Sequence, residues 1–307
     1  MQSSPDGHQT DSGIGQAGGG GSARPERKRT LVIGATGGVG AALIGQLLAS
    51  GHQVIATVRT SEQIASIERT YPAIEHVFAL DMADGDGVAA AIEHGLTGRG
   101  AVDAVVVCTG VAGFSPLEIA SLADFRRTLE INTVSCLAVY QAVLPILRET
   151  KGRLILISSY AGKVATPFIG RYSASKFALE ALGDAMRQEA RLSGVRVVLI
   201  LPGGIDTAMC DNMERDVKAE IATLSPEIAD RYGHYYHGHL AMLMGPGKSA
   251  PEQVGAVVQQ AIEADQPETR YVIGDGANWF IQQREELGDE QFDALAEGAF
   301  HQALGAA

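Results

Sequence analysis

Six short apolar runs, separated by longer segments of helical character, are the feature of this sequence that most limits its fold. The runs are rich in β-branched residues and lack the alternation of half-exposed strands, which is typical of parallel strands covered by helices on both faces. The chain is therefore predicted to be an α/β protein with a doubly wound parallel sheet. The runs span residues 31–33, 54–58, 77–80, 104–107, 154–157 and 195–201.

The chain divides into a tail, one domain and an extension. Residues 1–29 are rich in Gly, Ser, Gln and Asp, and such a composition buries too little apolar surface to offset its ordering entropy. With 307 residues and 46% apolar content, the remainder is expected to form a single domain over 30–280. Within it, residues 206–250 interrupt the alternation and predict a small helical cap. Residues 281–307 predict a C-terminal helical extension.

The charge and the cysteine content narrow the class of protein. A net charge of -12 argues against a nucleic-acid surface, which needs a basic stripe to neutralise phosphates. Cys108, Cys136 and Cys210 lack the close spacing of a metal or redox motif. No apolar run approaches the roughly 18 residues that span a membrane, and no signal-peptide core is evident at the N-terminus. We therefore expect a soluble cytoplasmic protein that acts on a small molecule.

A glycine-rich loop follows the first apolar run directly and precedes a helical segment. Glycines there permit a tight turn, and they let backbone N–H groups and the helix N-terminus approach a pyrophosphate. The loop therefore predicts a dinucleotide site, and a glycine-rich turn without a ligand is the alternative. Its candidate cofactor-binding residues are Gly34, Thr36, Gly37, Gly38, Val39 and Gly40.

The residues after the second and third apolar runs indicate which dinucleotide binds. Arg59, followed by Thr60, stands where an NAD-binding fold places an acidic residue, and a guanidinium would instead attract a 2′-phosphate. NADP is therefore the predicted cofactor, unless Arg59 points to solvent. Asp81, followed by Met82, is placed to bind the adenine amino group. The alternative is that Asp81 caps its own loop.

Tyr172, Lys176 and Ser159 form the candidate catalytic group. Residues four apart share a helix face, so the Lys176 ammonium can sit beside the Tyr172 phenol and favour its ionised form. A phenol with a lowered pKa can act as a general acid and base, and Ser159 can hydrogen-bond the same substrate oxygen. A tyrosine–lysine pair at this spacing also occurs on ordinary solvated helix faces.

Taken together, the glycine loop, Ser159 and the Tyr172–Lys176 pair resemble the short-chain dehydrogenase/reductase family over roughly residues 30–275. The resemblance implies that Asn132 completes a catalytic tetrad with Ser159, Tyr172 and Lys176, and that Lys176 also binds the nicotinamide ribose. It further implies that a turn after the sixth run contacts the nicotinamide end of the cofactor. The residues of that turn are Pro202, Gly203, Ile205 and Thr207.

The sequence departs from the family pattern after the fourth run. There the family usually has Asn-Asn-Ala-Gly, whereas this chain has Val107, Cys108, Thr109 and Gly110, so only Gly110 is retained. The glycine spacing fits both the shorter subfamily and a longer one that contains nucleotide-sugar epimerases and dehydratases. Asn132 and the turn after the sixth run favour the shorter one.

The predicted function is hydride transfer between NADP(H) and a hydrophobic secondary alcohol or ketone, with Tyr172 as general acid and base. Two alternatives remain open from the sequence. One is a non-catalytic protein that senses NADP, and the other is a nucleotide-sugar epimerase or dehydratase. The resemblance also implies a homo-dimer or homo-tetramer that forms through the helices containing Asn132 and Tyr172.

The cap is expected to supply the substrate pocket, with core packing of its helices as the alternative. His234, His237 and His239 lie in the same segment, but no cysteine is near them and the family needs no catalytic metal, so no metal site is predicted. The candidate pocket residues are Met209, Met213, Tyr232, Tyr235, Tyr236, Leu240, Met242, Leu243 and Met244.

Overall fold

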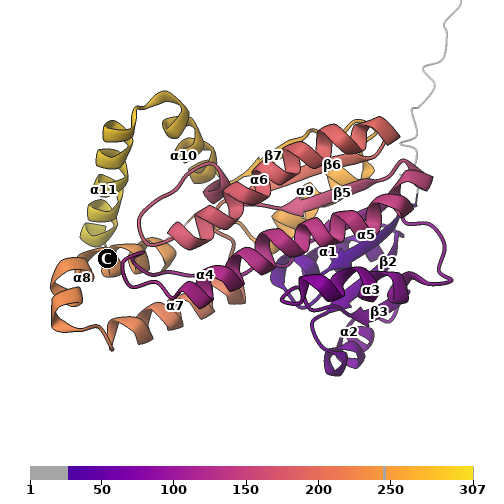
Figure 1. Cartoon of the computed structure of the whole chain (residues 1–307), viewed down its shortest axis with the longest axis horizontal. Helices are drawn as coiled ribbons and strands as arrows, with labels where there is room; N and C mark the ends of the chain where they lie inside the picture. Colours follow the sequence, from indigo (N-terminus) through magenta and orange to yellow (C-terminus); the bar gives the residue numbers. More distant parts are fainter. Residues whose placement is uncertain (1–26, 245–246, 307) are drawn as a thin grey trace, which may run out of the picture.

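The computed structural model describes residues 27–244 and 247–306, and these form a seven-stranded sheet in which all neighbouring strands are parallel (Figure 1). The strand order is β3-β2-β1-β4-β5-β6-β7, which confirms the predicted doubly wound sheet. Most of the predicted tail, residues 1–26, lies outside the described residues. The strands are β1 Arg29–Ile33, β2 Gln53–Val58, β3 His76–Ala79, β4 Ala104–Val107, β5 Arg153–Ile157, β6 Arg196–Pro202 and β7 Arg270–Ile273.

The six predicted strands form, with ends that differ by one or two residues. β1 begins at Arg29, which the sequence analysis placed in the tail. β7 was not predicted as a strand, because this short edge strand is only half-buried and shows no continuous apolar run. Burial on both faces produces such runs, and an edge position does not require them.

Helices cover both faces of the sheet, and successive strand residues point to opposite faces. Val32 packs with the apolar faces of α1 (Gly38–Ala49) and α9 (Pro251–Glu263), with α2 (Ile64–Thr70) at the margin. Leu31 and Ile33 pack instead with α3 (Gly85–Leu96), α5 (Ser135–Thr150) and α6 (Gly170–Ala190). These two cores hold the carboxyl ends of the strands in a fixed arrangement.

One helical segment meets the length and hydropathy needed to cross a membrane, contrary to expectation. It is Leu122–Thr150, which comprises α4 (Leu122–Leu129), a π-helical turn η2 (Glu130–Val134) and α5. The sequence analysis overlooked it because polar residues interrupt its apolar run. Three of these, Asn132, Thr133 and Ser135, are buried and hydrogen-bonded to other parts of the protein. Within the segment, α5 packs on the core at the centre of the sheet through Val139, Val143 and Leu147.

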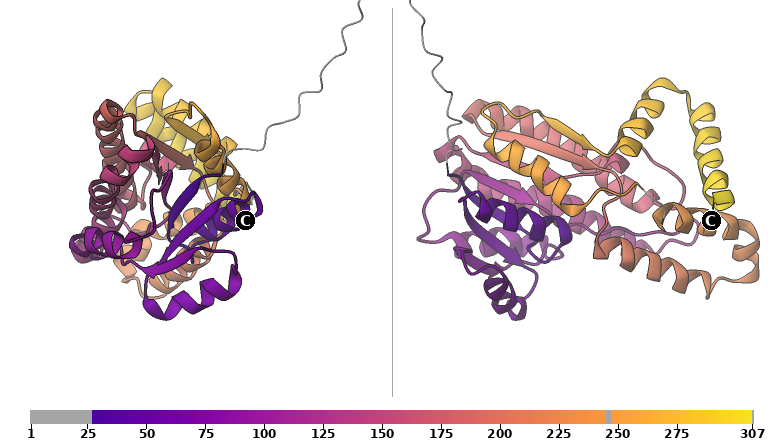
Figure 2. Two further views of the ribbon diagram at one scale, coloured as in Figure 1. Left: turned by 90° about the vertical axis from the view of Figure 1, so that its right-hand side faces the viewer. Right: turned by 180° about the vertical axis from the view of Figure 1, so that it is seen from behind.

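The segment predicted as a cap forms α7 (Ala208–Ile221) and α8 (Pro226–Met244). Figure 2 shows that these helices extend beyond one end of the sheet, with α10 (Asp275–Glu286) and α11 (Asp289–Ala306) beside them. The predicted boundary between residues 280 and 281 lies within α10, and the predicted extension contains the rest of α10 and α11. Short 3-10 turns complete the fold: η1 Ser61–Gln63, η3 Tyr160–Gly162 and η4 Arg191–Ser193.

Candidate active site

The glycine loop joins β1 to α1 at the carboxyl edge of the sheet. Gly34 has φ +101°, which favours glycine, and its N–H donates to the Thr57 hydroxyl at 3.2 Å. Gly37 is the N-cap of α1, and no side chain caps the helix or brings negative charge to its first turn. Its first N–H groups are therefore available to an anion, as a pyrophosphate site requires. Thr36 is exposed at the tip of the loop.

Gly40 is where the loop depends most strictly on glycine. A Cβ there would lie 2.2 Å from the backbone oxygen of Gly34, whereas a Cβ on Gly37 would meet nothing closer than 3.6 Å. We expect Gly40→Ala to destabilise the protein by about 1–3 kcal/mol, because the loop backbone must move. Gly37→Ala, the matched control, is expected to change stability by less than about 0.5 kcal/mol. Urea unfolding measures both, and equal stabilities would contradict this account.

The residues predicted to bind the adenosine end lie beyond β2 and β3. The Arg59 side chain is exposed and makes no hydrogen bond or ion pair with any described residue, so its guanidinium is free to bind a phosphate. Thr60 is the N-cap of η1. Asp81 is exposed, and its Oδ1 accepts from the Ala83 N–H at 3.0 Å. This contact matches the alternative interpretation, in which Asp81 caps its own loop. The Met82 side chain is buried, and its carbonyl accepts from the Ser135 hydroxyl.

Asn132 is fully buried in the π-helical turn and clamps the loop after β4. Its Oδ1 accepts from the Val111 N–H at 2.8 Å, and its Nδ2 donates to the Val111 carbonyl at 2.8 Å. Nδ2 also donates to the Ser175 hydroxyl at 2.9 Å, which links the loop to α6. A π-turn within an α-helix often marks a functional site, and here it carries a predicted site residue.

The departure from the family pattern leaves this loop anchored in another way. The Cys108 N–H donates to the Ile33 carbonyl at 2.9 Å, which continues the β1–β4 pairing. The methyl group of Thr109 lies close to Gly34, where an added Cβ would come within 2.7 Å of it. Asn132 then holds the following residue, Val111. Backbone pairing and one buried amide therefore fix the loop.

Ser159, Tyr172 and Lys176 come together at the ends of β5 and α6. Ser159 follows β5 and is the N-cap of η3, where its Oγ accepts from the Ala161 N–H at 3.1 Å. Tyr172 and Lys176 share one face of α6, and the Lys176 Nζ lies 5.8 Å from the centre of the Tyr172 ring. Nζ also donates to the Ile157 carbonyl at 2.9 Å, which holds it beside the end of β5.

The pKa of the Tyr172 phenol differs from the expectation. Desolvation raises this pKa above its usual value, and a hydrogen bond with Ser159 only partly offsets the increase. The Lys176 ammonium is itself desolvated, so its own pKa falls to about 8. Desolvation is therefore the dominant cause of the shift in the Tyr172 pKa. Tyr172 is a neutral phenol at pH 7, which suits a proton donor.

A single cavity of about 300 Å³ joins these elements at the carboxyl edge of the sheet. It brings together residues that follow β1, β4, β5 and β6, together with α6. The predicted residues Gly34, Thr36, Gly40, Arg59, Thr60, Asp81, Met82 and Asn132 do not line it. Those that do are Gly37, Gly38, Val39, Gly110, Ser159, Tyr172, Lys176, Pro202, Gly203, Ile205 and Thr207.

The cap contributes fewer pocket residues than predicted. Met209 and Met213 line the cavity, but Tyr232, Tyr235, Tyr236 and Leu240 do not. They pack with Phe114 and Phe168 in a small core of their own, in which Tyr236 is fully buried. The alternative of core packing therefore holds for these four. The side chains of Met242, Leu243 and Met244 lie outside the described residues.

Several residues that line the cavity were not predicted as site residues, among them Cys108, Cys210 and His239. His239 stacks on Phe114 with ring centres 3.9 Å apart, and desolvation lowers its pKa to about 4, so it is neutral. The sequence showed only that His239 lies in a histidine-rich segment, which does not indicate that its side chain reaches the cavity. His234 instead contacts Tyr235, and His237 is exposed. No three His, Cys, Asp or Glu side chains are grouped for a metal ion in residues 27–244 and 247–306.

Comparisons with known proteins agree on one family. A family model described as short chain dehydrogenase matches residues 28–218. The chain is 30% identical over 257 residues to an NADPH-dependent 3-dehydrocapnine reductase of Ornithobacterium rhinotracheale. The alignment covers 79% of this chain and 87% of the relative. The chain is 29% identical over 263 residues to retinol dehydrogenase 5 of Homo sapiens, with 80% of each chain covered.

The solved structures agree with the sequence comparisons. A short chain dehydrogenase from Burkholderia cenocepacia J2315, in complex with NADP, superimposes with a TM-score of 0.67 at 25% identity. The match covers 91% of this chain and 98% of that structure. The similarity therefore spans almost the entire length of the solved protein.

Proposed function

The chain belongs to the short-chain dehydrogenase family, and from this premise we propose that it reduces a ketone to a secondary alcohol with NADPH, or catalyses the reverse oxidation. One observation carries the proposal: Ser159, Tyr172 and Lys176 meet in the same cavity as the glycine loop. A proton donor and a dinucleotide cradle within one cavity suit hydride transfer to a carbonyl.

The residues present fit the dinucleotide. The first turn of α1 has free N–H groups and no side-chain cap, and Gly38 packs so closely on Thr207 that a Cβ would lie 2.6 Å from its methyl carbon. The glycine loop would hold the pyrophosphate, and the turn at Pro202–Thr207 would hold the nicotinamide end. When bound, the reduced nicotinamide supplies the hydride.

The protein residues handle the proton. As the substrate oxygen gains negative charge, Tyr172 donates a proton to it, and Ser159 donates a hydrogen bond to the same oxygen. Lys176, held by the Ile157 carbonyl, places positive charge beside the phenolate that remains. Because the Tyr172 phenol is neutral at pH 7, the site is prepared for reduction. The lining from Ala161, Ile169, Met209 and Met213 favours an apolar group next to the carbonyl.

The cofactor preference rests on Arg59. We expect Arg59→Asp to weaken NADPH binding about tenfold or more and to improve NADH binding, because it replaces a phosphate-binding charge with a ribose-binding one. Titration followed by reduced-nicotinamide fluorescence measures both affinities. Arg69→Asp on α2, also exposed, is the matched control and should leave the ratio unchanged. Tighter binding of NADH by the unchanged protein would contradict the NADP assignment.

The reaction itself is tested by NADPH oxidation with a panel of ketones that vary in chain length. Turnover that increases with the apolar size of the substituent supports the proposal. NADPH binding without turnover of any ketone would favour the sensing alternative.

The oligomeric state is a further part of the proposal. Val134 and Phe177, on the two long helices, leave 47% and 43% of their surfaces exposed. We expect these helices to pack against a second copy, which light scattering tests.

A further inference from the structure

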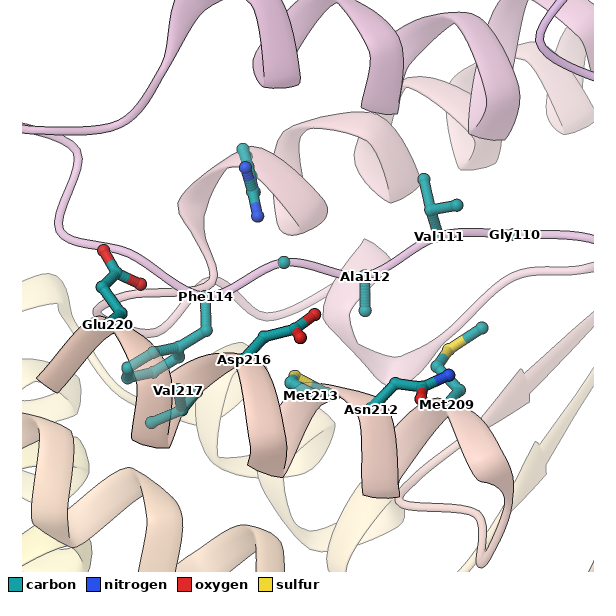
Figure 3. Close-up of a pocket in the computed structure, with 12 residues that line it drawn as sticks. Gly110, Val111, Ala112, Phe114, Met209, Asn212, Met213, Asp216, Val217 and Glu220 are labelled. Atoms are coloured by element: carbon teal, nitrogen blue, oxygen red, sulfur yellow. The ribbon is translucent and has the colours of Figure 1, made fainter. Parts of the chain in front are cut away.

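A second cavity, of about 300 Å³, adjoins the catalytic cavity on the side of α7. The two share Gly110, Ala112, Gly113, Met209 and Met213, so a bound molecule can extend from one into the other. Figure 3 shows Asp216 and Asn212 pointing from α7 toward the loop that carries Val111 and Ala112. We call this second cavity the α7 groove. The α7 groove contains charged side chains of both signs, Arg171 from α6 and Asp216 and Glu220 from α7.

Arg171 supplies positive charge to the groove. Its guanidinium lies against Gly113, where an added Cβ would come within 2.2 Å of three guanidinium atoms. Its Nε is buried without a hydrogen-bond partner, and its ion pair is a single contact of 3.5 Å to Asp124, whose side chain is 60% exposed. Two guanidinium nitrogens therefore have no ion-pair partner among the described residues. The arginine side chain itself is only 17% exposed.

Negative charge lines the same groove from α7. Among the described residues Asp216 makes one ion pair, at 3.5 Å with the exposed Arg215, and its side chain is 74% exposed. Glu220 also lines the groove, but its Oε1 already accepts from the Ser115 and Tyr236 hydroxyls. Arg171 makes no ion pair with either carboxylate, although all three residues line one groove. The groove therefore contains both signs of charge without an ion pair between them.

We propose that the α7 groove binds the zwitterionic end of an amino-acid-like ketone, with its anionic group on Arg171 and its ammonium group facing Asp216. This inference rests on the proposed function. An anion alone would be repelled by Asp216, and an amine alone would be repelled by Arg171, so a substrate end with both charges fits the groove best. The groove shares five lining residues with the cavity that holds Tyr172, so the charged end belongs on the part of the substrate next to the carbonyl.

Four derivatives of one ketone test the proposal. The probes are 2-amino-4-oxononanoate, its N-acetyl acid, its methyl ester and its N-acetyl methyl ester, which are zwitterionic, anionic, cationic and neutral at their polar end. We expect the zwitterion to be reduced with the highest kcat/KM, about tenfold above the neutral probe, as expected for hydrogen bonds to charged groups. Equal or faster reduction of the neutral probe would overturn the inference while leaving the proposed function intact.

Variants assign each charge to its residue. Arg171→Gln should lower kcat/KM about tenfold for the zwitterion and the anionic probe, and should raise it for the cationic probe, which Arg171 repels. Asp216→Asn should lower it about threefold for the zwitterion and the cationic probe, because Asp216 is more exposed. Arg187→Gln on α6 and Asp211→Asn on α7 remove the same charges outside the groove and should change nothing. A uniform loss with all four probes would mean that Arg171 acts only through structure.

If turnover is too slow to measure, binding of the zwitterionic probe tests the inference instead. Calorimetry of the zwitterionic probe with Tyr172→Phe protein and NADPH should show binding that Arg171→Gln weakens about tenfold. Binding that is indifferent to Arg171 would overturn the inference. Failure of the proposed function would look different, because no ketone of any charge would then oxidise NADPH.

Discussion

Replacement of Tyr172 by phenylalanine is expected to lower kcat for ketone reduction by about 10²–10⁴-fold, the usual contribution of a positioned proton donor. The change removes one oxygen atom and retains the ring, so the packing of α6 against the cavity is preserved. NADPH binding should stay within about twofold, because the phenol lies at the reacting carbonyl and the glycine loop does not depend on it. Steady-state NADPH oxidation and fluorescence titration measure the two quantities.

Tyr160→Phe is the matched control for this prediction. Tyr160 lines the same cavity, and burial raises its pKa to about 12, so it resembles Tyr172 in chemistry and surroundings. It lies on η3, however, and not four residues before a lysine. We expect this variant to retain at least about a tenth of the activity, because the Tyr160 hydroxyl would affect only the position of the substrate and not the proton transfer. If both variants lose activity equally, Tyr172 is not the specific proton donor.

The pH dependence of reduction provides an independent check on the role of Tyr172. Burial raises the pKa of its phenol, so the acid form predominates throughout the neutral range. The rate of reduction should therefore be flat at neutral pH and should decrease as the pH rises and the phenol ionises. A rate that increases from neutral to alkaline pH would assign Tyr172 the opposite role, that of a base.

The fold was predictable because burial on both faces leaves a direct mark on the sequence. Strands such as β4, Ala104–Val107, are fully apolar because helices cover both faces of the sheet. A strand with one exposed face would alternate between apolar and polar residues. The edge strand β7 carries no such mark, and its pairing with β6 depends on tertiary contacts. The glycine loop was predictable for a related reason, since Gly40 lies too close to the Gly34 backbone to admit a side chain.

The cap and the pKa values could not be predicted in the same way. Met213 and Tyr236 both looked like pocket residues, yet only Met213 reaches the cavity, because the contacts of α8 with Phe114 and Phe168 bury Tyr236. The spacing of Tyr172 and Lys176 correctly predicted that they share a face. It contained no information on desolvation, which depends on the surrounding structure and reverses the expected pKa shift.

Asn132→Leu is expected to destabilise the protein by about 3 kcal/mol, since the half-buried Val111 N–H and carbonyl would each lose their partner. Leucine has the same number of side-chain heavy atoms as asparagine and the same branching at Cγ, so the loss would come mainly from hydrogen bonding. Gly110, the one residue retained from the family pattern in this loop, packs between the Asn132 amide and the Lys176 ammonium, where its added Cβ would lie 3.4 and 3.6 Å from them. Reduction activity should therefore decrease together with stability.

Ser175→Ala separates the clamp from the rest of the network. The Ser175 hydroxyl accepts from Asn132 and donates to the Tyr172 carbonyl at 2.7 Å, so its removal leaves both contacts to Val111 in place. We expect a loss of about 1 kcal/mol for this variant, the typical contribution of a hydrogen bond. Urea unfolding of the two variants compares these values. If Asn132→Leu costs no more than Ser175→Ala, the loop after β4 does not depend on the amide, and its backbone pairing through Cys108 is sufficient to hold it.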